Sequence, residues 1–192
     1  MSWGRLRSSG LAVAIVFIVT ITTFASIPAQ PAEAYRPYIC NYHDAVIGYF
    51  FASAVKNNTA YSDAAKGAVS AWTNLTEATL YSTTSPELTI DAVNSGNQDF
   101  DARFYYDGCN RTTSVWIGDT FAIWNRFDTD AYSVNAKKSV IVHEIGHGLG
   151  LDHTGSSSCA GQPIMYGSNS RWFTCGHVNP QQDDINGIAA TY

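Results

Sequence analysis

The alternation of hydrophobic and polar positions predicts a chain of mixed strands and helices. Residues 45–53 (AVIGYFFAS) are β-branched and aromatic, which is typical of a strand. A polar turn at 56–59 follows, and Ser62 is a candidate N-cap for a helix that runs to about Asn74. The apolar residues of this helix recur at helical spacing and would share one face: Ala65, Ala68, Val69 and Trp72.

The central part of the chain is rich in residues that favour strands. Four further strands are expected, at 87–93, 100–106, 113–117 and 121–127. The dipeptides Asp107-Gly108 and Gly118-Asp119 have the composition of turns, and the second of them separates the last two strands.

A second helix and a loop-rich end complete the expected order. Ser133 or Asn135 can cap a helix that ends near Gly148. Residues 150–176 show little periodicity, and Pro180 at a first helical position predicts a last helix. This order predicts an α+β fold, with a twisted mixed β-sheet of about five strands, two helices behind it and a loop-rich C-terminal subdomain. An active site would lie in a cleft between the sheet and the loops.

The N-terminal residues resemble a secretion signal. Arg5 and Arg7 form a basic start, residues 11–25 form an apolar run, and Ala32-Glu33-Ala34 matches a small-x-small cleavage site. The apolar run is short for a transmembrane helix, although an uncleaved anchor is the alternative. We therefore expect residues 1–34 to be removed, leaving one secreted, extracellular domain over residues 35–192.

Charge and cysteine content narrow the partners and the compartment. The formal net charge is −5 at pH 7, and no stretch of the chain is strongly basic. This distribution argues against binding to nucleic acid or to an anionic membrane. An exported chain enters an oxidising compartment, so its four cysteines are expected to form two disulfides rather than to bind metal.

Residues 143–153 (HEIGHGLGLDH) carry the clearest chemical signal. His143 and His147 are four residues apart and lie one turn apart on the same helix face, where they can bind one metal ion. Glu144 is not needed as a ligand, which leaves it free to act as a base on a metal-bound water. Gly150 can adopt the positive φ that ends the helix, so that His153 can return as a third ligand. Three imidazoles leave one tetrahedral position open, as in catalytic zinc sites.

The extended motif is specific. With 5 His and 15 Gly in 192 residues, its five fixed positions would match by chance on the order of 10⁻⁵ times per chain. H-E-x-x-H-x-x-G-x-x-H followed by a methionine-bearing turn resembles the signature of the metzincin metalloproteases, and residues 163–167 (PIMYG) resemble that Met-turn. Leu-Gly-Leu-Asp-His ending at His153 resembles the matrixins in particular, as do the helix-like residues 182–188 and, more weakly, residues 63–72.

The resemblance implies a set of site roles. One catalytic zinc ion would be bound by the three histidines, with Glu144 as the base. Met165 would form a hydrophobic floor beneath the ligands rather than bind the metal, since a thioether is a poor partner for zinc. Matrixins often hold a second, structural zinc with histidines and an aspartate, but residues 99–119 contain no histidine. We therefore expect no structural zinc, and His43 and His177 to be ordinary surface or hydrogen-bonded residues.

Calcium and the cysteines leave alternatives open. Calcium is common in the family, and Asp128 and Asp130 are spaced like oxygen ligands, but two carboxylates are a weak signal for a calcium site.

The four cysteines allow three disulfide pairings, and we favour Cys159–Cys175 around the Met-turn with Cys40–Cys109. A latency thiol at Cys40 is the rival interpretation, because matrixins are kept inactive by a propeptide cysteine, although the residues around Cys40 do not resemble that motif.

The family also implies that an edge strand of the sheet lines the cleft. Our candidate for this strand is Phe121, Ala122, Ile123 and Trp124, to which a peptide could add by backbone hydrogen bonds. An interior strand whose aromatic residues belong to the core is the alternative. Taken together, the sequence predicts a secreted, monomeric zinc endopeptidase acting on peptide or protein substrates. A secreted zinc-binding protein without catalysis, and a peptidase dedicated to one cell-wall or partner substrate, are the alternatives.

Overall fold

The computed structural model describes residue 1, residues 35–155 and residues 158–192. The expected signal segment therefore lies outside the described residues, apart from Met1. Within the described part, none of the helices combines the length and the apolar character needed to cross a membrane.

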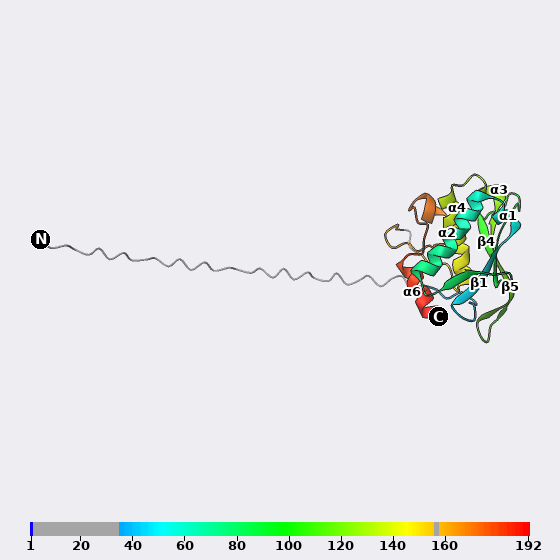
Figure 1. Cartoon of the computed structure of the whole chain (residues 1–192), viewed down its shortest axis with the longest axis horizontal. Coiled ribbons are helices and arrows are strands. Elements are labelled where there is room, and N and C mark those ends of the chain that lie inside the picture. The colour runs from blue at the N-terminus through cyan, green and yellow to red at the C-terminus, as the bar shows by residue number, and fades with distance from the viewer. Residues whose placement is uncertain (2–34, 156–157) are drawn as a thin grey trace.

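A five-stranded mixed sheet forms one layer of the fold (Figure 1). The strands follow the spatial order β2-β1-β3-β5-β4. Four of them run parallel, and β4 runs antiparallel to β5. The expected mixed sheet of about five strands is confirmed. The strands are β1 (Val46–Phe51), β2 (Thr79–Ser82), β3 (Leu88–Val93), β4 (Ala102–Asn110) and β5 (Val115–Asn125).

The two long helices, α2 and α4, pack against each other on one side of the sheet (Figure 1). Among the residues that the structure describes, three single-turn helices and a C-terminal helix complete the fold. The helices are α1 (Ser53–Lys56), α2 (Thr59–Leu75), α3 (Arg126–Thr129), α4 (Val134–Gly148), α5 (Ser170–Phe173) and α6 (Gln182–Thr191).

Several expected element boundaries were wrong. Helix α2 begins before Ser62, because the Asn58 side chain accepts the backbone N–H groups of Ala60 and Tyr61 and caps the helix there. The helix expected from Pro180 begins at Gln182 instead, with a reciprocal capping box at its start. Strand β2 and the short helices α1, α3 and α5 were not expected, and four-residue elements carry little periodic signal.

The two strands expected at 113–117 and 121–127 form one continuous strand, β5. Gly118 has a positive φ of 74°, but the chain does not reverse there. The Asp107 carboxylate accepts the backbone N–H of Asp119 at 3.0 Å, beside a register shift between Tyr106 and Gly108. The glycine therefore marks a bulge between paired strands rather than a turn.

The expectation that Phe121–Trp124 forms an edge strand is also wrong. Strand β5 lies between β3 and β4, and Ala122 and Trp124 are fully buried. Strand β4 is the edge of the sheet that lies nearest the histidine motif on α4. Hydrophobic pattern alone cannot specify strand order, because order depends on pairings between distant segments.

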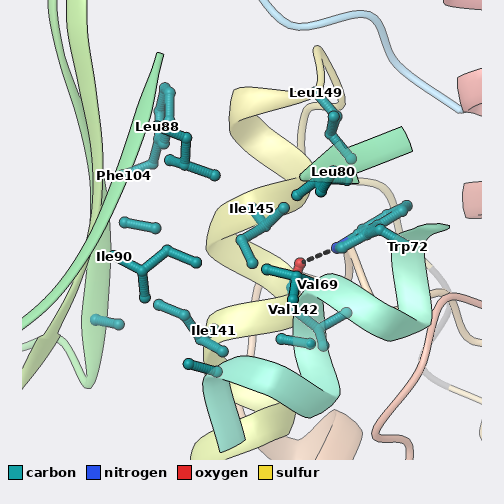
Figure 2. Packing of buried hydrophobic residues seen from close by; sticks show 14 of the residues in the cluster. Val69, Trp72, Leu80, Leu88, Ile90, Phe104, Ile141, Val142, Ile145 and Leu149 are labelled. Carbon is teal, nitrogen blue, oxygen red and sulfur yellow. Dashed lines mark hydrogen bonds between the residues drawn. The ribbon is translucent and has the colours of Figure 1, made fainter. Parts of the chain in front are cut away.

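The hydrophobic core lies between the sheet and the helices. Ile141 and Ile145 of α4 point toward strand residues such as Ile90, while Val142 faces α2 (Figure 2). Fully burying one such aliphatic side chain stabilises the fold by about 1.5–3 kcal/mol. The core thus fixes the orientation of α4, the helix that carries the histidines.

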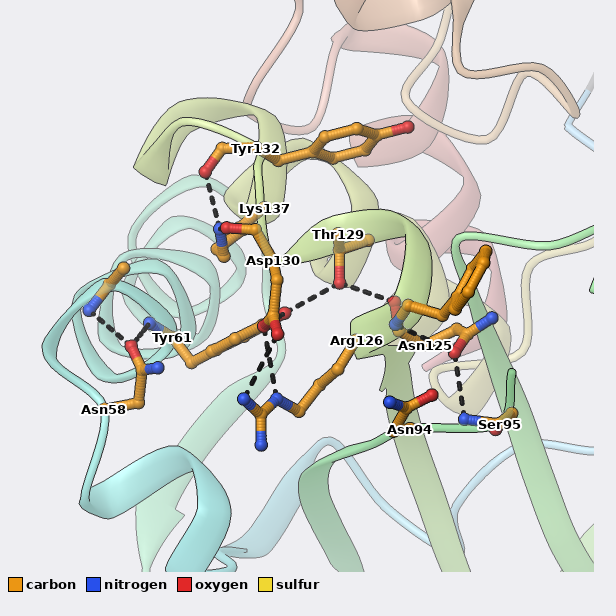
Figure 3. Close-up of polar contacts among 12 residues, drawn as sticks. Asn58, Tyr61, Asn94, Ser95, Asn125, Arg126, Thr129, Asp130, Tyr132 and Lys137 are labelled. Carbon is orange, nitrogen blue, oxygen red and sulfur yellow. Dashed lines mark hydrogen bonds and ion pairs between the residues drawn. The ribbon is translucent and has the colours of Figure 1, made fainter. Parts of the chain in front are cut away.

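A polar cluster holds the chain just before α4. The Asp130 carboxylate accepts hydrogen bonds from Tyr61 at 2.9 Å and from Arg126 at 3.1 Å (Figure 3). The buried ammonium of Lys137 donates to the backbone carbonyls of Asp130 and Tyr132. These contacts tie the start of α4 to α2 and α3.

All four cysteines are paired, Cys40 with Cys109 and Cys159 with Cys175, which is the pairing favoured from the sequence. The first bridge joins the segment before β1 to the end of β4. The backbone N–H of Tyr38 also donates to the Gly150 carbonyl at 2.7 Å, so this segment runs beside the end of the histidine motif. Cys40 is not a free thiol in this structure.

Candidate metal centre

Helix α4 is fixed by three tryptophans as well as by its cap. The Ser133 hydroxyl accepts the backbone N–H of Ala136 at 3.2 Å, and so caps the helix as one of the two expected residues. Three indole N–H groups donate to carbonyl oxygens along the helix: Trp124 to Lys137 at 3.1 Å, Trp72 to Val142 at 3.0 Å and Trp116 to Gly148 at 2.8 Å. These bonds hold the helix at its start, its middle and its end.

The three histidines converge on one point. The Nε2 atom of His153 lies 3.0 Å from Nε2 of His143 and 3.1 Å from Nε2 of His147. Gly150 has a φ of +98°, which turns the chain back and brings His153 over the helix, as expected from the sequence. A tetrahedral zinc ion with Zn–N bonds of 2.0–2.1 Å needs ligand nitrogens about 3.4 Å apart. The observed separations fit such an ion with small adjustments.

The outer ring nitrogens of the helix histidines are held by backbone carbonyls. Nδ1 of His143 lies 2.8 Å from the Ile164 oxygen, and Nδ1 of His147 lies 2.8 Å from the Leu151 oxygen. A carbonyl only accepts hydrogen bonds, so each Nδ1 carries the proton and each Nε2 presents its lone pair to the centre. Burial lowers the pKa of His143, and it lowers the pKa of His147 to about 4. The rings are therefore neutral, as a metal ligand must be.

Glu144 lies beside the histidines in the wall of the same cleft. The side chain is buried, and burial raises its pKa to about 7, although the Arg171 charge and the Phe104 backbone N–H oppose the shift. A cation bound by the adjacent histidines would favour the carboxylate form further. The residue therefore holds a carboxyl group at the position where a base is needed.

The Met-turn lies beneath the ligands and is held by a residue that sequence reasoning missed. Met165 is fully buried. The Asp184 carboxylate accepts the backbone N–H groups of Ile164 at 2.7 Å and of Met165 at 3.1 Å. Since the Ile164 carbonyl in turn contacts His143, Asp184 supports the ligand from α6. Its sequence signal was weak, an acidic residue in the first turn of the last helix.

A cleft of about 650 Å³ opens over the histidines. One wall is the free edge of β4 together with the residues before it, and the other is the segment after the Met-turn. Tyr38 also lines the cleft, with its ring centroid 5.1 Å from that of His147, and Arg171 lies on the far wall. Neither residue was identified from the sequence, because contact with the site depends on tertiary packing.

The other candidate ligands do not join this site. Among residues 35–155 and 158–192, the three histidines are the only cluster of three or more His, Cys, Asp or Glu side chains with metal-binding geometry. Nε2 of His177 lies 3.1 Å from the Cys159 carbonyl oxygen, and His43 is exposed. Asp130 is paired with Arg126, and Asp128 accepts a hydrogen bond from Asn125. A calcium site at these two aspartates has no support in the structure.

Comparison with known proteins agrees with this geometry. A family model described as matrixin matches residues 47–192, and the chain belongs to this family of peptidases. A "Probable matrix metalloproteinase 095L" of Invertebrate iridescent virus 3 is 32% identical over 69 residues, covering 36% of this chain and 17% of that protein. A "Putative matrix metalloproteinase" of Spodoptera frugiperda ascovirus 1a is 42% identical over 78 residues, covering 38% of this chain and 19% of that protein. The matches thus span less than a fifth of either relative.

Proposed function

We propose that this protein is a secreted, zinc-dependent endopeptidase that works as a monomer. The observation that carries the proposal is the convergence of His143, His147 and His153 in an open cleft, directly beside the buried carboxyl group of Glu144. A site built only to hold zinc has no need of that carboxyl group. Membership of the matrixin family supports the same reaction class.

Glu144 would handle the protons of the reaction. A zinc ion held by the three histidines would supply Lewis acidity and lower the pKa of a water on its open position to about 7. The Glu144 carboxylate would accept the proton of the attacking water and then deliver it to the leaving amine. The neutral imidazoles leave this proton transfer to Glu144, because their Nδ1 protons are engaged by backbone carbonyls.

The substrate backbone would bind along β4 rather than along β5. The structure places β4 at the edge of the sheet, and Ala102, Arg103 and Phe104 line the cleft. Alternate backbone groups of an edge strand are unpaired, so an extended peptide can add as a further strand. This addition would align the peptide with the histidines without requiring a particular side chain.

A peptide-library assay tests the proposed reaction. The zinc-loaded protein should cleave internal bonds of a mixed peptide library, and a zinc chelator should stop cleavage. Glu144→Gln should keep its zinc but lose activity by about 10²–10⁴-fold, the usual contribution of general-base catalysis. Glu77→Gln is the matched control, because Glu77 is exposed and distant from the motif in sequence. Activity of Glu144→Gln within about threefold of wild type would exclude Glu144 as the base.

Export and oligomeric state need separate measurements. The proposed signal predicts that protein recovered from the culture medium begins at Tyr35. N-terminal sequencing decides this, and retention of residues 1–34 would instead support the uncleaved anchor. Light scattering during size exclusion should give the mass of a single chain.

A further inference from the structure

Arg171 is a buried cation in the wall of the cleft. It lies on α5, six residues after Met165, and only 5% of its surface is exposed. The cleft lining includes Arg171 together with His143 and Glu144 of α4. Arg171 therefore borders the space that a substrate would occupy near the reacting bond, and its charge acts on both His143 and Glu144.

The hydrogen bonds of this guanidinium are incomplete. Nη1 donates to the Tyr166 carbonyl at 3.3 Å. The buried Nε of Arg171 has no hydrogen-bond partner among the described residues, although a guanidinium offers five N–H donors. Within the same part of the chain, no carboxylate lies within the 4.0 Å of an ion pair with Arg171. A buried cation is unfavourable unless an anion compensates it.

The acidic residues around Arg171 are committed elsewhere. Burial lowers the pKa of Arg171, and the charges of Glu144, Asp101 and Asp184 oppose this shift. Asp101 accepts hydrogen bonds from a tyrosine and an asparagine side chain, and Asp184 accepts from the Met-turn backbone. Glu144 is the proposed base. The direct counter-ion position of Arg171 is thus left to a ligand.

The segment that carries Arg171 is held in place. The Cys159–Cys175 disulfide closes the loop that contains the Met-turn and α5. The Arg171 carbonyl accepts the backbone N–H of His177 at 2.8 Å, which ties α5 to the residues beyond the bridge. A guanidinium on a fixed support can recognise a planar carboxylate through two parallel hydrogen bonds.

We propose that Arg171 determines specificity by binding a substrate carboxylate just past the cleaved bond. The proposal rests on the proposed peptidase function. The carboxylate can come from two sources: the side chain of a glutamate that follows the cleaved bond, or the free C-terminus of a short substrate. Both present the same planar anion to the guanidinium, and they are distinguished by peptide design.

Matched peptides provide the test. Four peptides would carry Glu or Gln after the cleaved bond, each with a free or an amidated C-terminus. Wild type should show a kcat/KM at least about tenfold higher for Glu than for Gln, or for the free than for the amidated C-terminus. Arg171→Met should abolish that ratio, and Arg171→Lys should keep part of it, because an ammonium lacks the planar fork. Arg111→Met, an exposed turn substitution, should leave it unchanged.

A binding measurement separates failure of this inference from failure of the proposed function. The zinc-loaded Glu144→Gln variant would be titrated by calorimetry with glutamyl-alanine amide, glutaminyl-alanine amide and glutaminyl-alanine with a free C-terminus. If no peptide is cleaved, the peptidase proposal fails, and the same titrations of the Glu144→Gln, Arg171→Met double variant still decide the role of Arg171, because the carboxylate preference should be lost there. If Arg171→Met does not fold, the wild-type ratios decide alone. Equal cleavage and equal binding in every arm would overturn the inference.

Discussion

The sulfur of Met165 occupies the place where a side chain at Gly146 would have to lie. A Cβ built on Gly146 would overlap that sulfur and would approach Cζ2 of Trp72 to 3.1 Å. The glycine inside the histidine motif is therefore required by packing, not by backbone conformation, since it lies within α4. It allows the Met-turn to lie directly against the helix that carries two of the histidines.

The first prediction follows from this contact. Gly146→Ala should lower the free energy of unfolding, because overpacking costs about 1–3 kcal/mol while the gain in helix propensity is only about 1 kcal/mol. Gly67→Ala is the matched control in α2, where the new methyl would meet only the flexible side chain of Lys138. That variant should be as stable as wild type or more stable. Denaturant unfolding of both variants decides the point, and equal stabilisation would show that Met165 moves aside freely.

A double variant identifies the cause. Met165→Ala alone should be destabilising by about 2–5 kcal/mol, because it leaves a cavity beneath the histidines. Combined with Gly146→Ala, it should be less destabilising than the sum of the two single effects, since each substitution compensates the other. Strict additivity would mean that the two side chains do not compete for the same space.

Local patterns in the sequence predicted much of the geometry of the candidate site. The four-residue spacing of His143 and His147, the turn at Gly150 and the buried turn around Met165 are all found as expected. Each depends on residues close together in the chain, where helical periodicity and backbone conformation are strong constraints. Strand propensity is also local, and the total of about five strands agrees because the unexpected β2 offsets the joining of two expected strands into β5.

Apart from the Cys40–Cys109 pairing, the features of the site that depend on distant contacts were not predicted. The position of β4 at the sheet edge results from pairing with β5, and no local pattern of Phe121–Trp124 reveals it. Tyr38, Arg171 and Asp184 reach the site only through the folded arrangement of the N-terminal segment, α5 and α6. Contacts between residues far apart in the chain are therefore the part of the site that sequence patterns predict least well.

The second prediction concerns the metal. Wild type should bind one zinc ion, and His153→Ala should lose most of it, because two imidazoles on α4 cannot complete the coordination. His43→Ala, which changes an exposed histidine away from the site, is the control. Metal analysis after dialysis measures the occupancy, and a chelator should lower the melting temperature of wild type but not of His153→Ala. Full occupancy in His153→Ala would contradict the three-histidine site.

The third prediction concerns Asp184. Burial raises its pKa to about 6, above an ordinary value near 3.8, although its backbone donors favour the charged form. A raised folded-state pKa means that the folded state binds the proton more tightly, so stability should fall as the pH rises from about 4 to about 6. Asp184→Asn should remove this pH-dependent contribution to the free energy of unfolding. A pKa difference of about two between the folded and unfolded states corresponds to about 3 kcal/mol.

The pH dependence is measured as a difference between variants. The stability advantage of wild type over Asp184→Asn should be larger at pH 4 than at pH 7. The amide also loses one acceptor for the Met-turn backbone, which lowers stability at both pH values by about 1–3 kcal/mol. Asp63→Asn, an exposed substitution in α2, should show neither effect. An advantage that grows with pH would show that the backbone donors outweigh burial.

The last prediction separates the roles of the two disulfides. Replacing Cys159 and Cys175 with serine should cost about 3 kcal/mol in the chain-entropy model, and replacing Cys40 and Cys109 about 4 kcal/mol, because the second pair closes the longer loop, of 69 residues against 16. Substrate selectivity should respond in the opposite order, with the larger effect after loss of Cys159–Cys175. The loop from 159 to 175 contains α5 and the Met-turn, so its release should reduce discrimination among substrate side chains while zinc is retained. Peptide mapping without reduction first verifies both pairings, and cleavage profiles of the two serine pairs at matched zinc content then measure selectivity. A broader profile after loss of Cys40–Cys109 than after loss of Cys159–Cys175 would show that the N-terminal segment, not the loop, shapes the pocket.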